Sequence, residues 1–310
     1  MRSVAAYGIT MLGASFWGLT GLFVQRLYMF GFSPIHVVTI RMVLSMVILF
    51  SIVGIIRPYL LKIHLRDLPY FIGLGVVSIA LFNWFYFTVM EQASLSVAVV
   101  LLYTSPVFVA LISRFVFQEA FTVNKIGAVV LTTAGCSLVA GFFPFGSMNL
   151  TVSVVFFGLA SGFFCGLYSI IGKSVSRKYH SVTITAYSMM CGGAFLLPVS
   201  GIEKNLMPFL EPIVWIHVLG SVLVSTILAY VLYTAGLKYI ESSHAAVLAT
   251  IEPIVGIIVG VLVFGDELTG WQSAGIVLVF SSIILSVFSN GNKFRSKRQR
   301  RYFSDNGNAM

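Results

Sequence analysis

The chain has 310 residues, of which 58% are hydrophobic and only 9% are charged. A soluble domain carries roughly 25% charged residues, so this composition excludes an ordinary water-soluble protein. It indicates instead an all-α membrane protein whose solvent is lipid. The net charge of +9 does not indicate nucleic-acid binding, because the basic residues occupy short breaks between apolar runs and one C-terminal tail.

The three cysteines, Cys136, Cys165 and Cys191, fall inside apolar runs, and none forms a CxxC pair. Their spacing supports neither a metal site nor a disulfide nor a redox motif. The chain also carries no HExxH, Walker A or Gly-x-Ser-x-Gly motif, which are typical of enzymes and ATP-driven pumps. We therefore expect no cofactor, no metal and no enzymatic activity.

Ten apolar runs are each long enough to cross a bilayer, which takes about 20 helical residues. In chain order the predicted spans are 4–25, 34–56, 68–89, 95–117, 123–141, 152–171, 182–201, 214–237, 243–264 and 271–289. The first run resembles a signal peptide, but it is long and has no clear small-residue cleavage site before Gln25. We expect it to be a permanent helix.

The basic residues predict the orientation of these spans. If the N-terminus is inside, sixteen of the 19 basic residues fall in inside segments. Only Arg26 and Lys204 fall outside, and Arg41 lies within a span. The positive-inside rule therefore predicts a multi-pass protein of the inner or plasma membrane with both termini in the cytoplasm.

The two halves of the chain are related by a repeat. Segment 86–122 matches segment 233–269 at a shift of 147 residues. The matched pairs are Tyr86 and Tyr233, Ala98 and Ala245, Pro106 and Pro253, Phe117 and Phe264, and Thr122 and Thr269. We predict a first five-helix repeat over 1–145, a second over 146–290, and a basic, disordered cytoplasmic tail over 291–310.

Five spans is an odd number, so the second repeat must insert upside down relative to the first. Inverted repeats are a recurring design of secondary transporters, which bind their substrate near the midplane between the repeats. A duplication retained for folding alone is the alternative interpretation.

Two stretches resemble the paired repeats of the EamA family, within the drug/metabolite transporter superfamily. They are Ser105-Pro106 followed by Glu119-Ala120-Phe121-Thr122, and Glu252-Pro253 followed by Asp266-Glu267-Leu268-Thr269. Gly127 and Gly275 fall eight residues after Glu119 and Glu267, as in the family pattern. The second stretch has one extra residue, so either Asp266 or Glu267 is the matching acid. The resemblance implies ten helices and export or exchange of amino acids, metabolites or drugs.

Pro106 and Pro253 lie near the middle of the fourth and ninth predicted spans. A proline inside a helix removes one hydrogen bond and clashes with the carbonyl four residues earlier, here that of Leu102 or Ala249. In lipid the freed carbonyl needs protein or cavity water as a partner. Two matching helix breaks predict a shared central cavity, while a pair of packing kinks is the structural alternative.

Glu252 stands beside Pro253 in mid-span. An acid at this depth costs a few kcal/mol unless it is paired, hydrated or protonated, so we expect it to face the cavity. It could bind a substrate amine, carry a proton, or stabilise neighbouring helices. Arg41 lies roughly 10 Å below the outer surface, at 1.5 Å per residue. It could snorkel outward, form an outer gate or bind a substrate carboxylate.

Several amphipathic side chains lie inside spans or near their ends, and their polar tips need partners when they are buried. The candidates for lining a pocket with Arg41 and Glu252 are Trp17, Asn83, Tyr86, Tyr103, Tyr168 and Tyr233. Each is individually more typical of packing or of an interfacial belt. Glu119, Asp266 and Glu267 lie in short loops, where capping or hairpin stabilisation is the favoured interpretation.

Taken together, the sequence predicts a secondary transporter that exports small metabolites, amino acids or drug-like solutes by alternating access. The expected partners are a small-molecule substrate and the lipid bilayer, and no nucleic acid. Proton coupling and a homodimer are left open. A lipid flippase, a membrane-embedded enzyme or a non-transporting membrane protein are the alternatives.

Overall fold

The computed structural model describes residues 3–93, 95–141 and 151–287, and within these ranges the chain is helical with no strand. The all-α prediction is therefore confirmed. Nine of the described helices are long and apolar enough to cross a membrane, and a tenth apolar helix, α8, has 17 residues. The predicted tail, residues 291–310, lies outside the described residues.

The first half contains five spans, three of which are interrupted. Span 1 is α1 (Ser3–Gly18) with α2 (Thr20–Met29), and span 2 is α3 (Pro34–Ile56). Span 3 consists of α4 (Leu68–Ile72), a π-helical segment (Gly73–Leu81) and α5 (Phe82–Gln92). Span 4 is α6 (Leu95–Leu102) with α7 (Ser105–Val116), and span 5 is α8 (Val123–Val139).

The second half repeats this order. Spans 6 and 7 are α9 (Val152–Val175) and α10 (Ser181–Ser200). Span 8 joins α11 (Pro212–Val222) and α12 (Ala229–Leu237) through a π-helical segment (Leu223–Leu228). Span 9 is α13 (Ser242–Ala249) with α14 (Ile251–Val259) and a π-helical end (Gly260–Phe264). Span 10 is the last helix, Gly270–Val287.

The first span continues four residues beyond its predicted end. The predicted span is 4–25, which ends at Gln25. In the structure Gln25 and Arg26 both belong to α2, which ends at Met29. The stop comes from Gly31, whose φ of 84° is a left-handed conformation that glycine adopts without strain.

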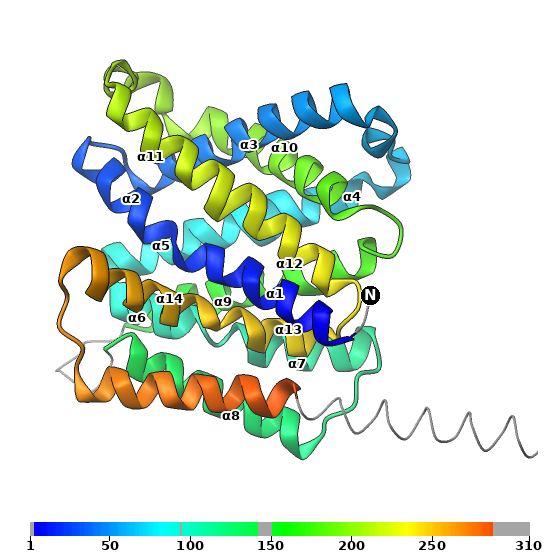
Figure 1. Cartoon of the computed structure of the whole chain (residues 1–310), viewed down its shortest axis with the longest axis vertical. Helices are drawn as coiled ribbons and strands as arrows, with labels where there is room; N and C mark the ends of the chain where they lie inside the picture. Colours follow the sequence, from blue (N-terminus) through cyan, green and yellow to red (C-terminus); the bar gives the residue numbers. More distant parts are fainter. Residues whose placement is uncertain (1–2, 94, 142–150, 288–310) are drawn as a thin grey trace, which may run out of the picture.

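The packing of the helices follows the inverted repeat (Figure 1). α1 packs against α12, and its counterpart α9 packs against α5. α3 packs against its own counterpart α10. α8 and the last helix lie together at one edge of the molecule, where Thr132 Oγ1 donates to Ser282 Oγ at 2.8 Å. Spans 1 to 4 and 6 to 9 therefore form the body of the protein.

The interruptions of spans 3 and 4 match those of spans 8 and 9, whereas the break between α1 and α2 has no counterpart in α9. The break between α6 and α7 falls at residues 103–104, and the break between α13 and α14 falls at Thr250. The π-helical segments of spans 3 and 8 end at Leu81 and Leu228, which are 147 residues apart. Wide π turns are rare and often mark functional sites.

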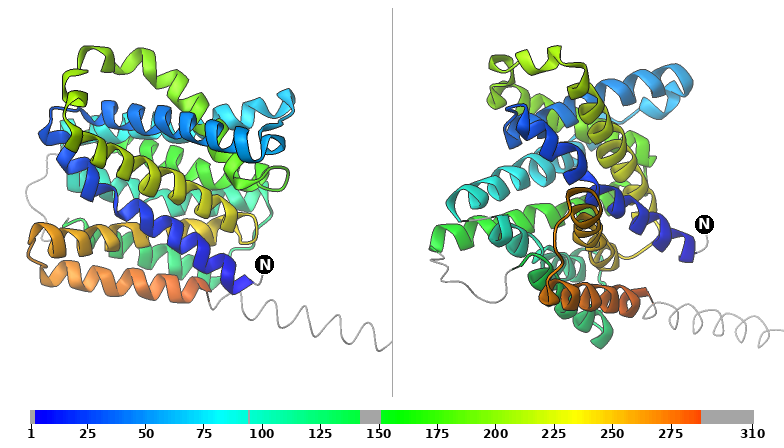
Figure 2. Two further views of the ribbon diagram at one scale, coloured as in Figure 1. Left: turned by 45° about the horizontal axis from the view of Figure 1, so that its top comes forward. Right: turned by 60° about the vertical axis from the view of Figure 1, so that its left-hand side comes forward.

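The outer surface of the bundle is apolar. Val4, Phe115 and Val152 are each more than three-quarters exposed. Such a surface is stable only in contact with lipid, in agreement with the spans predicted from the sequence. The further views in Figure 2 show the same bundle from two other sides.

Candidate functional site: a central cavity

A cavity of about 410 Å³ lies between the two halves and is lined by spans 1 to 4 and 6 to 9. All eight side chains that the sequence proposed for substrate binding line it: Trp17, Arg41, Asn83, Tyr86, Tyr103, Tyr168, Tyr233 and Glu252. Pro106 lines it as well. Pro253 is not among the lining residues, because the side chain at the second break that faces the cavity is that of Glu252.

The cavity is asymmetric along the bundle. At one end it is lined by Gln25, Tyr28 and Pro34, where α2 ends and α3 begins. Its deepest lining residues at the other end include Ser169 and Ala246. We call the first end the α2–α3 end and the second the α13 end.

Ser105 and Glu252 occupy equivalent places, each at the start of the helix that follows a break. Each proline stands within the first turn of its helix, where no backbone N–H is needed. α6 ends at Leu102 and α13 ends at Ala249, the residues whose carbonyls lie four positions before the prolines. The two breaks thus bring irregular backbone and one acid to the cavity wall.

Arg41 is held by the π-helical segment of span 8. Its Nε donates to Thr226 Oγ1 at 2.8 Å, and its Nη2 donates to the Ser225 carbonyl at 2.9 Å. Thr226 Oγ1 in turn donates to the carbonyl of Ser221, five residues earlier, at 3.0 Å. The wide turn therefore presents a backbone oxygen that stabilises a buried guanidinium at the cavity wall, between the two halves.

Aromatic rings from spans 1, 6 and 8 also line the cavity. The ring of Trp17 lies 5.0 Å from that of Tyr230 and 4.8 Å from that of Tyr233, measured between centroids. Tyr168 packs edge-on against Tyr230 at 5.1 Å. The indole Nε1 of Trp17 is buried and has no partner in the described part of the chain. This donor is available to an oxygen of a bound solute.

The sequence analysis missed Tyr230, which lines the cavity and contacts two of the predicted residues. The repeat could have identified Tyr230, because it lies 147 residues after Asn83 and is therefore the equivalent position in the second half. Thr226 was also missed, since nothing in a linear sequence marks a π turn.

Hydrogen bonds join the helices at the α13 end of the cavity. Tyr233 and Ser169 share a hydrogen bond of 2.7 Å between their hydroxyls. Tyr168 and Thr234 share one of 2.9 Å. Below them, Ser242 Oγ donates to the Ser169 carbonyl at 3.3 Å. These contacts join α9 to α12 and α13.

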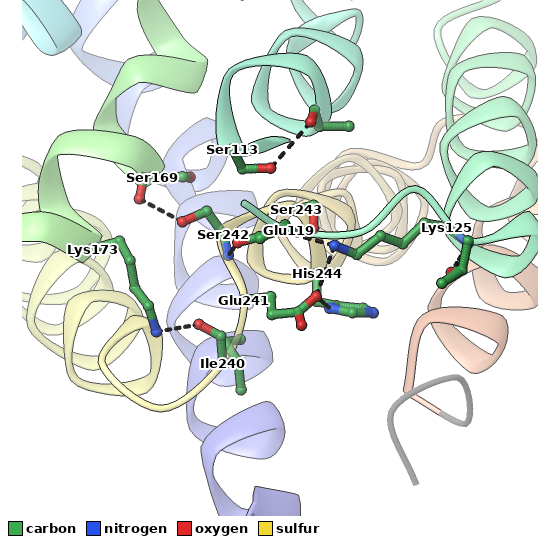
Figure 3. Close-up of polar contacts among 12 residues, drawn as sticks. Ser113, Glu119, Lys125, Ser169, Lys173, Ile240, Glu241, Ser242, Ser243 and His244 are labelled. Atoms are coloured by element: carbon green, nitrogen blue, oxygen red, sulfur yellow. Dashed lines mark hydrogen bonds and ion pairs between the residues drawn. The ribbon is translucent and has the colours of Figure 1, made fainter. Parts of the chain in front are cut away.

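A buried polar cluster lies beyond this layer, and Figure 3 shows it. We call it the Glu119 cluster; its members are Glu119, Lys125, Glu241, Ser242, Ser243 and His244. Glu119 accepts hydrogen bonds from the backbone N–H of Ser242 at 2.9 Å and from the hydroxyl of Ser243. Lys125 Nζ lies 2.9 Å from Glu119 and 2.7 Å from Glu241. An acid of the first half thus caps the broken helix of the second half.

Glu241 is the partly exposed member of this cluster and lies in the loop before α13. The imidazole of His244, whose Nδ1 lies 3.4 Å from Glu241 Oε2, and the ammonium group of Lys125 lower the pKa of Glu241 to about 2. Glu241 is therefore charged at neutral pH and keeps the Lys125 pair intact.

Two further lysines tie the same end together. Lys173 Nζ donates to the carbonyls of Leu237, Lys238 and Ile240 at the C-terminus of α12. Lys178 pairs with Asp67 at 2.7 Å, and Tyr179 donates to the same carboxylate at 2.8 Å. Both contacts restrain the α13 end by fixing loops and helix ends.

Among the described residues, no group of three His, Cys, Asp or Glu side chains is placed to hold a metal ion. The cavity instead offers one acid, one guanidinium, several phenol groups and an indole donor. Such a site can bind and orient a small solute.

Comparisons with known proteins agree with this geometry. The EamA-like transporter family matches residues 5–141 and again residues 152–288. An uncharacterized transporter of Archaeoglobus fulgidus is 26% identical over 280 residues, which is 90% of this chain and 97% of that protein. The uncharacterized transporter YxxF of Bacillus subtilis is 24% identical over 216 residues, which is 68% of this chain and 68% of YxxF. A solved crystal structure shares the fold, with a TM-score of 0.74 at 17% identity over 92% of this chain and 97% of that one.

The described part of the chain has ten apolar helices in two inverted five-helix repeats, and the matches to a transporter family and to proteins named as transporters define a multi-pass membrane transporter. Because the family matches both halves, the chain belongs to the EamA-like transporter family.

Proposed function

We propose that the protein is a secondary exporter of small amphipathic solutes that works by alternating access. The observation that carries the proposal is the cavity at the two helix breaks, which places Glu252, Arg41 and an aromatic wall around one space. A volume of about 410 Å³ falls within the range of small-molecule sites.

The chemistry of the lining narrows the class of solute. Glu252 suits a cationic amine, or it carries a proton in exchange for the solute. Arg41 and the unpartnered indole donor of Trp17 suit a carboxylate or a carbonyl oxygen. The rings of Tyr168 and Tyr230 suit a flat apolar body. Amino acids, related metabolites and drug-like amines combine these features.

Export in the expected orientation defines the roles of the two ends of the cavity. With both termini inside, the α13 end faces the cytoplasm and the α2–α3 end faces outward. The sixteen inside basic residues support this orientation. An exporter would then take up its solute at the α13 end and release it at the α2–α3 end.

Transport in vesicles tests the proposal. Inside-out vesicles that contain the protein should accumulate amino acids or toxic amines faster than vesicles that contain the Glu252→Gln variant. Competition assays with amines, carboxylates and zwitterions then rank these classes of solute by how strongly the protein prefers them. If no member of a broad panel moves, or if the variant transports every solute at the wild-type rate, the proposal is wrong.

A further inference from the structure

Glu119 is a contact between the two halves. It lies in the loop after α7, and it caps the N-terminus of α13 across the interface. Its side chain is almost fully buried, and Lys125 pairs with it. A carboxylate at a helix N-terminus satisfies free N–H groups and interacts favourably with the helix dipole. This contact joins the loop after α7 to the start of α13.

The loop after α14 has the same backbone as the loop that carries Glu119. Gln118 and Gly265, 147 residues apart, both have left-handed φ angles, of 55° and 75°. The next residue of each loop then donates its N–H to the carbonyl six residues earlier. Glu119 N donates to Ser113 O at 3.3 Å, and Asp266 N donates to Gly260 O at 3.1 Å.

This geometry identifies the counterpart of Glu119. The sequence left Asp266 and Glu267 as alternatives, and the matched turn selects Asp266. Thr122 and Thr269, three residues after these acids, cap the helices that follow: Thr122 Oγ1 accepts from Lys125 N, and Thr269 Oγ1 accepts from Gln272 N. The two loops are therefore structural equivalents up to the next helix.

The two acids differ in their surroundings. Glu119 is 8% exposed, whereas Asp266 is exposed. The counterpart of α13 is α6, which begins at Leu95 and lies in the other half. The lining of the cavity includes Gln25 and Tyr28 at the α2–α3 end, whereas hydrogen bonds of Ser169 to Tyr233 and Ser242 lie between the cavity and Glu119 at the other end. The buried acid thus lies at the end of the cavity that these hydrogen bonds cross.

We propose that Glu119 and Asp266 are alternating latches: Glu119 closes the α13 end in this conformation, and Asp266 caps α6 to close the α2–α3 end in the opposite one. The proposal rests on the alternating-access function above. It follows from the inverted repeat, because exchanging the conformations of equivalent halves reverses the open end. Asp266 is a positioning residue and contacts no solute.

The native Cys165 provides a reporter, because its side chain lines the cavity. Replacing Cys136 and Cys191 by alanine leaves it as the single thiol. An impermeant maleimide is added to right-side-out or to inside-out vesicles, so that each end is probed separately. We expect the parent protein to be labelled faster from the α2–α3 end.

Three variants separate the latches. Glu119→Gln should increase labelling from the α13 end by at least about fivefold, because the amide loses the charge that Lys125 and the helix N-terminus stabilise. Asp266→Asn should decrease labelling from that end below the parent value. Glu267→Gln is the matched control, with the same change of charge one residue away, and should label like the parent.

The double variant Glu119→Gln/Asp266→Asn should return the labelling ratio towards the parent value. Should Glu119→Gln fail to fold, Ser243→Ala removes one donor to Glu119 and should shift labelling in the same direction by a smaller factor. If Asp266→Asn is labelled like the parent, Asp266 is not a latch. The same conclusion follows if the control Glu267→Gln changes labelling as much as Asp266→Asn does. Labelling requires no substrate, so failure of the latches is distinguishable from absence of transport.

Discussion

The broken helices of the two halves share a backbone plan and differ in their chemistry. In both, one helix stops, one or two residues intervene, and a second helix starts around a proline. The first half places Ser105 there, and the second half places Glu252. The break is therefore a property of the repeat, whereas the charge is specific to one copy.

Two equivalent glycines of spans 1 and 6 also differ in the atoms that surround them. Gly18 of α1 lies against the backbone of Glu252, and a Cβ on it would stand 2.6 Å from the Glu252 carbonyl oxygen. Gly166 of α9 lies against the first turn of α7, where a Cβ would stand 2.9 Å from a methyl of Val109 and 3.1 Å from the Ser105 hydroxyl. The nearest atoms to a new Cβ are thus a backbone oxygen and the Val255 Cβ, both at 2.6 Å, in one half, and the ends of two side chains in the other, with the Ser105 carbonyl oxygen at 3.3 Å.

The largest effect on transport is expected at Glu252, and the comparison is with its equivalent Ser105 at the other break. Glu252→Gln should lower transport by about 10- to 100-fold, since a contact to a charged group contributes about 1.5–3 kcal/mol. Ser105→Ala should change transport by less than about threefold. Transport in vesicles measures both.

Two assays separate the roles of Glu252. If it exchanges protons, Glu252→Gln abolishes pH-driven uptake but permits counterflow of solute against solute. If it binds an amine, both modes weaken together. Full activity of the variant in both assays, at normal expression and detergent stability, would show that the acid is structural and that the breaks are chemically equivalent.

The next largest effect concerns the capped start of α13. Lys125→Met should lower the free energy of unfolding by about 3 kcal/mol, because it leaves the buried carboxylate of Glu119 without its cation. The matching position in the second half is Gln272, which stands three residues after Thr269 as Lys125 stands three residues after Thr122. Gln272→Met should stay within about 1 kcal/mol of the parent, because it removes only hydrogen bonds to the exposed cap residue Thr269. Unfolding in mixed micelles with SDS measures both, and equal losses would contradict the asymmetry.

The glycine contacts predict a smaller difference. Gly18→Ala should cost about 2 kcal/mol, since the new methyl group meets backbone that can move only with α14. Gly166→Ala should cost about 1 kcal/mol, because side chains can adjust. Thermal unfolding in detergent compares them. A larger loss in Gly166→Ala would mean that the second break tolerates more movement than its contacts indicate.

The smallest effect is a pH dependence at Glu241. Its pKa is lowered from 4.5 to about 2 by His244 and Lys125, so its contribution to stability is complete above pH 4.5. The contribution decreases as the pH falls from 4.5 towards 2. The difference in melting temperature between the parent and Glu241→Gln should therefore shrink as the pH falls from 4.5 towards 2. A difference that stayed constant over this range would contradict the assignment.

The sequence predicted the helical fold and the repeat because both depend on features that are local or periodic. A span is a run of apolar residues, and the repeat is a constant shift between two such series. The prolines likewise located the breaks, since a proline restricts its own helix wherever it stands. The eight proposed side chains line one cavity because amphipathic residues in mid-span need partners that lipid does not supply.

The partners of these side chains could not be predicted from the sequence. The contacts from Arg41 to Thr226 and from Glu119 to Ser242 join residues 185 and 123 positions apart, and they depend on how the halves pack. We interpreted Glu119 as a cap or hairpin residue; the structure shows that it caps a helix of the other half. The choice between Asp266 and Glu267 as the counterpart of Glu119 depended on the backbone conformation of the loop. The sequence alone could not make that choice, because both residues are acids.

Trp17 gives the cavity an optical readout of its own. The other tryptophans, Trp84, Trp215 and Trp271, are 59%, 40% and 47% exposed, whereas the Trp17 indole nitrogen is buried at the cavity wall. Replacing those three by phenylalanine leaves one fluorophore among tyrosine rings. A solute oxygen that accepts a hydrogen bond from the indole would shift its emission to longer wavelength. Occupancy of the cavity could then be titrated in detergent solution without a radiolabel or a membrane.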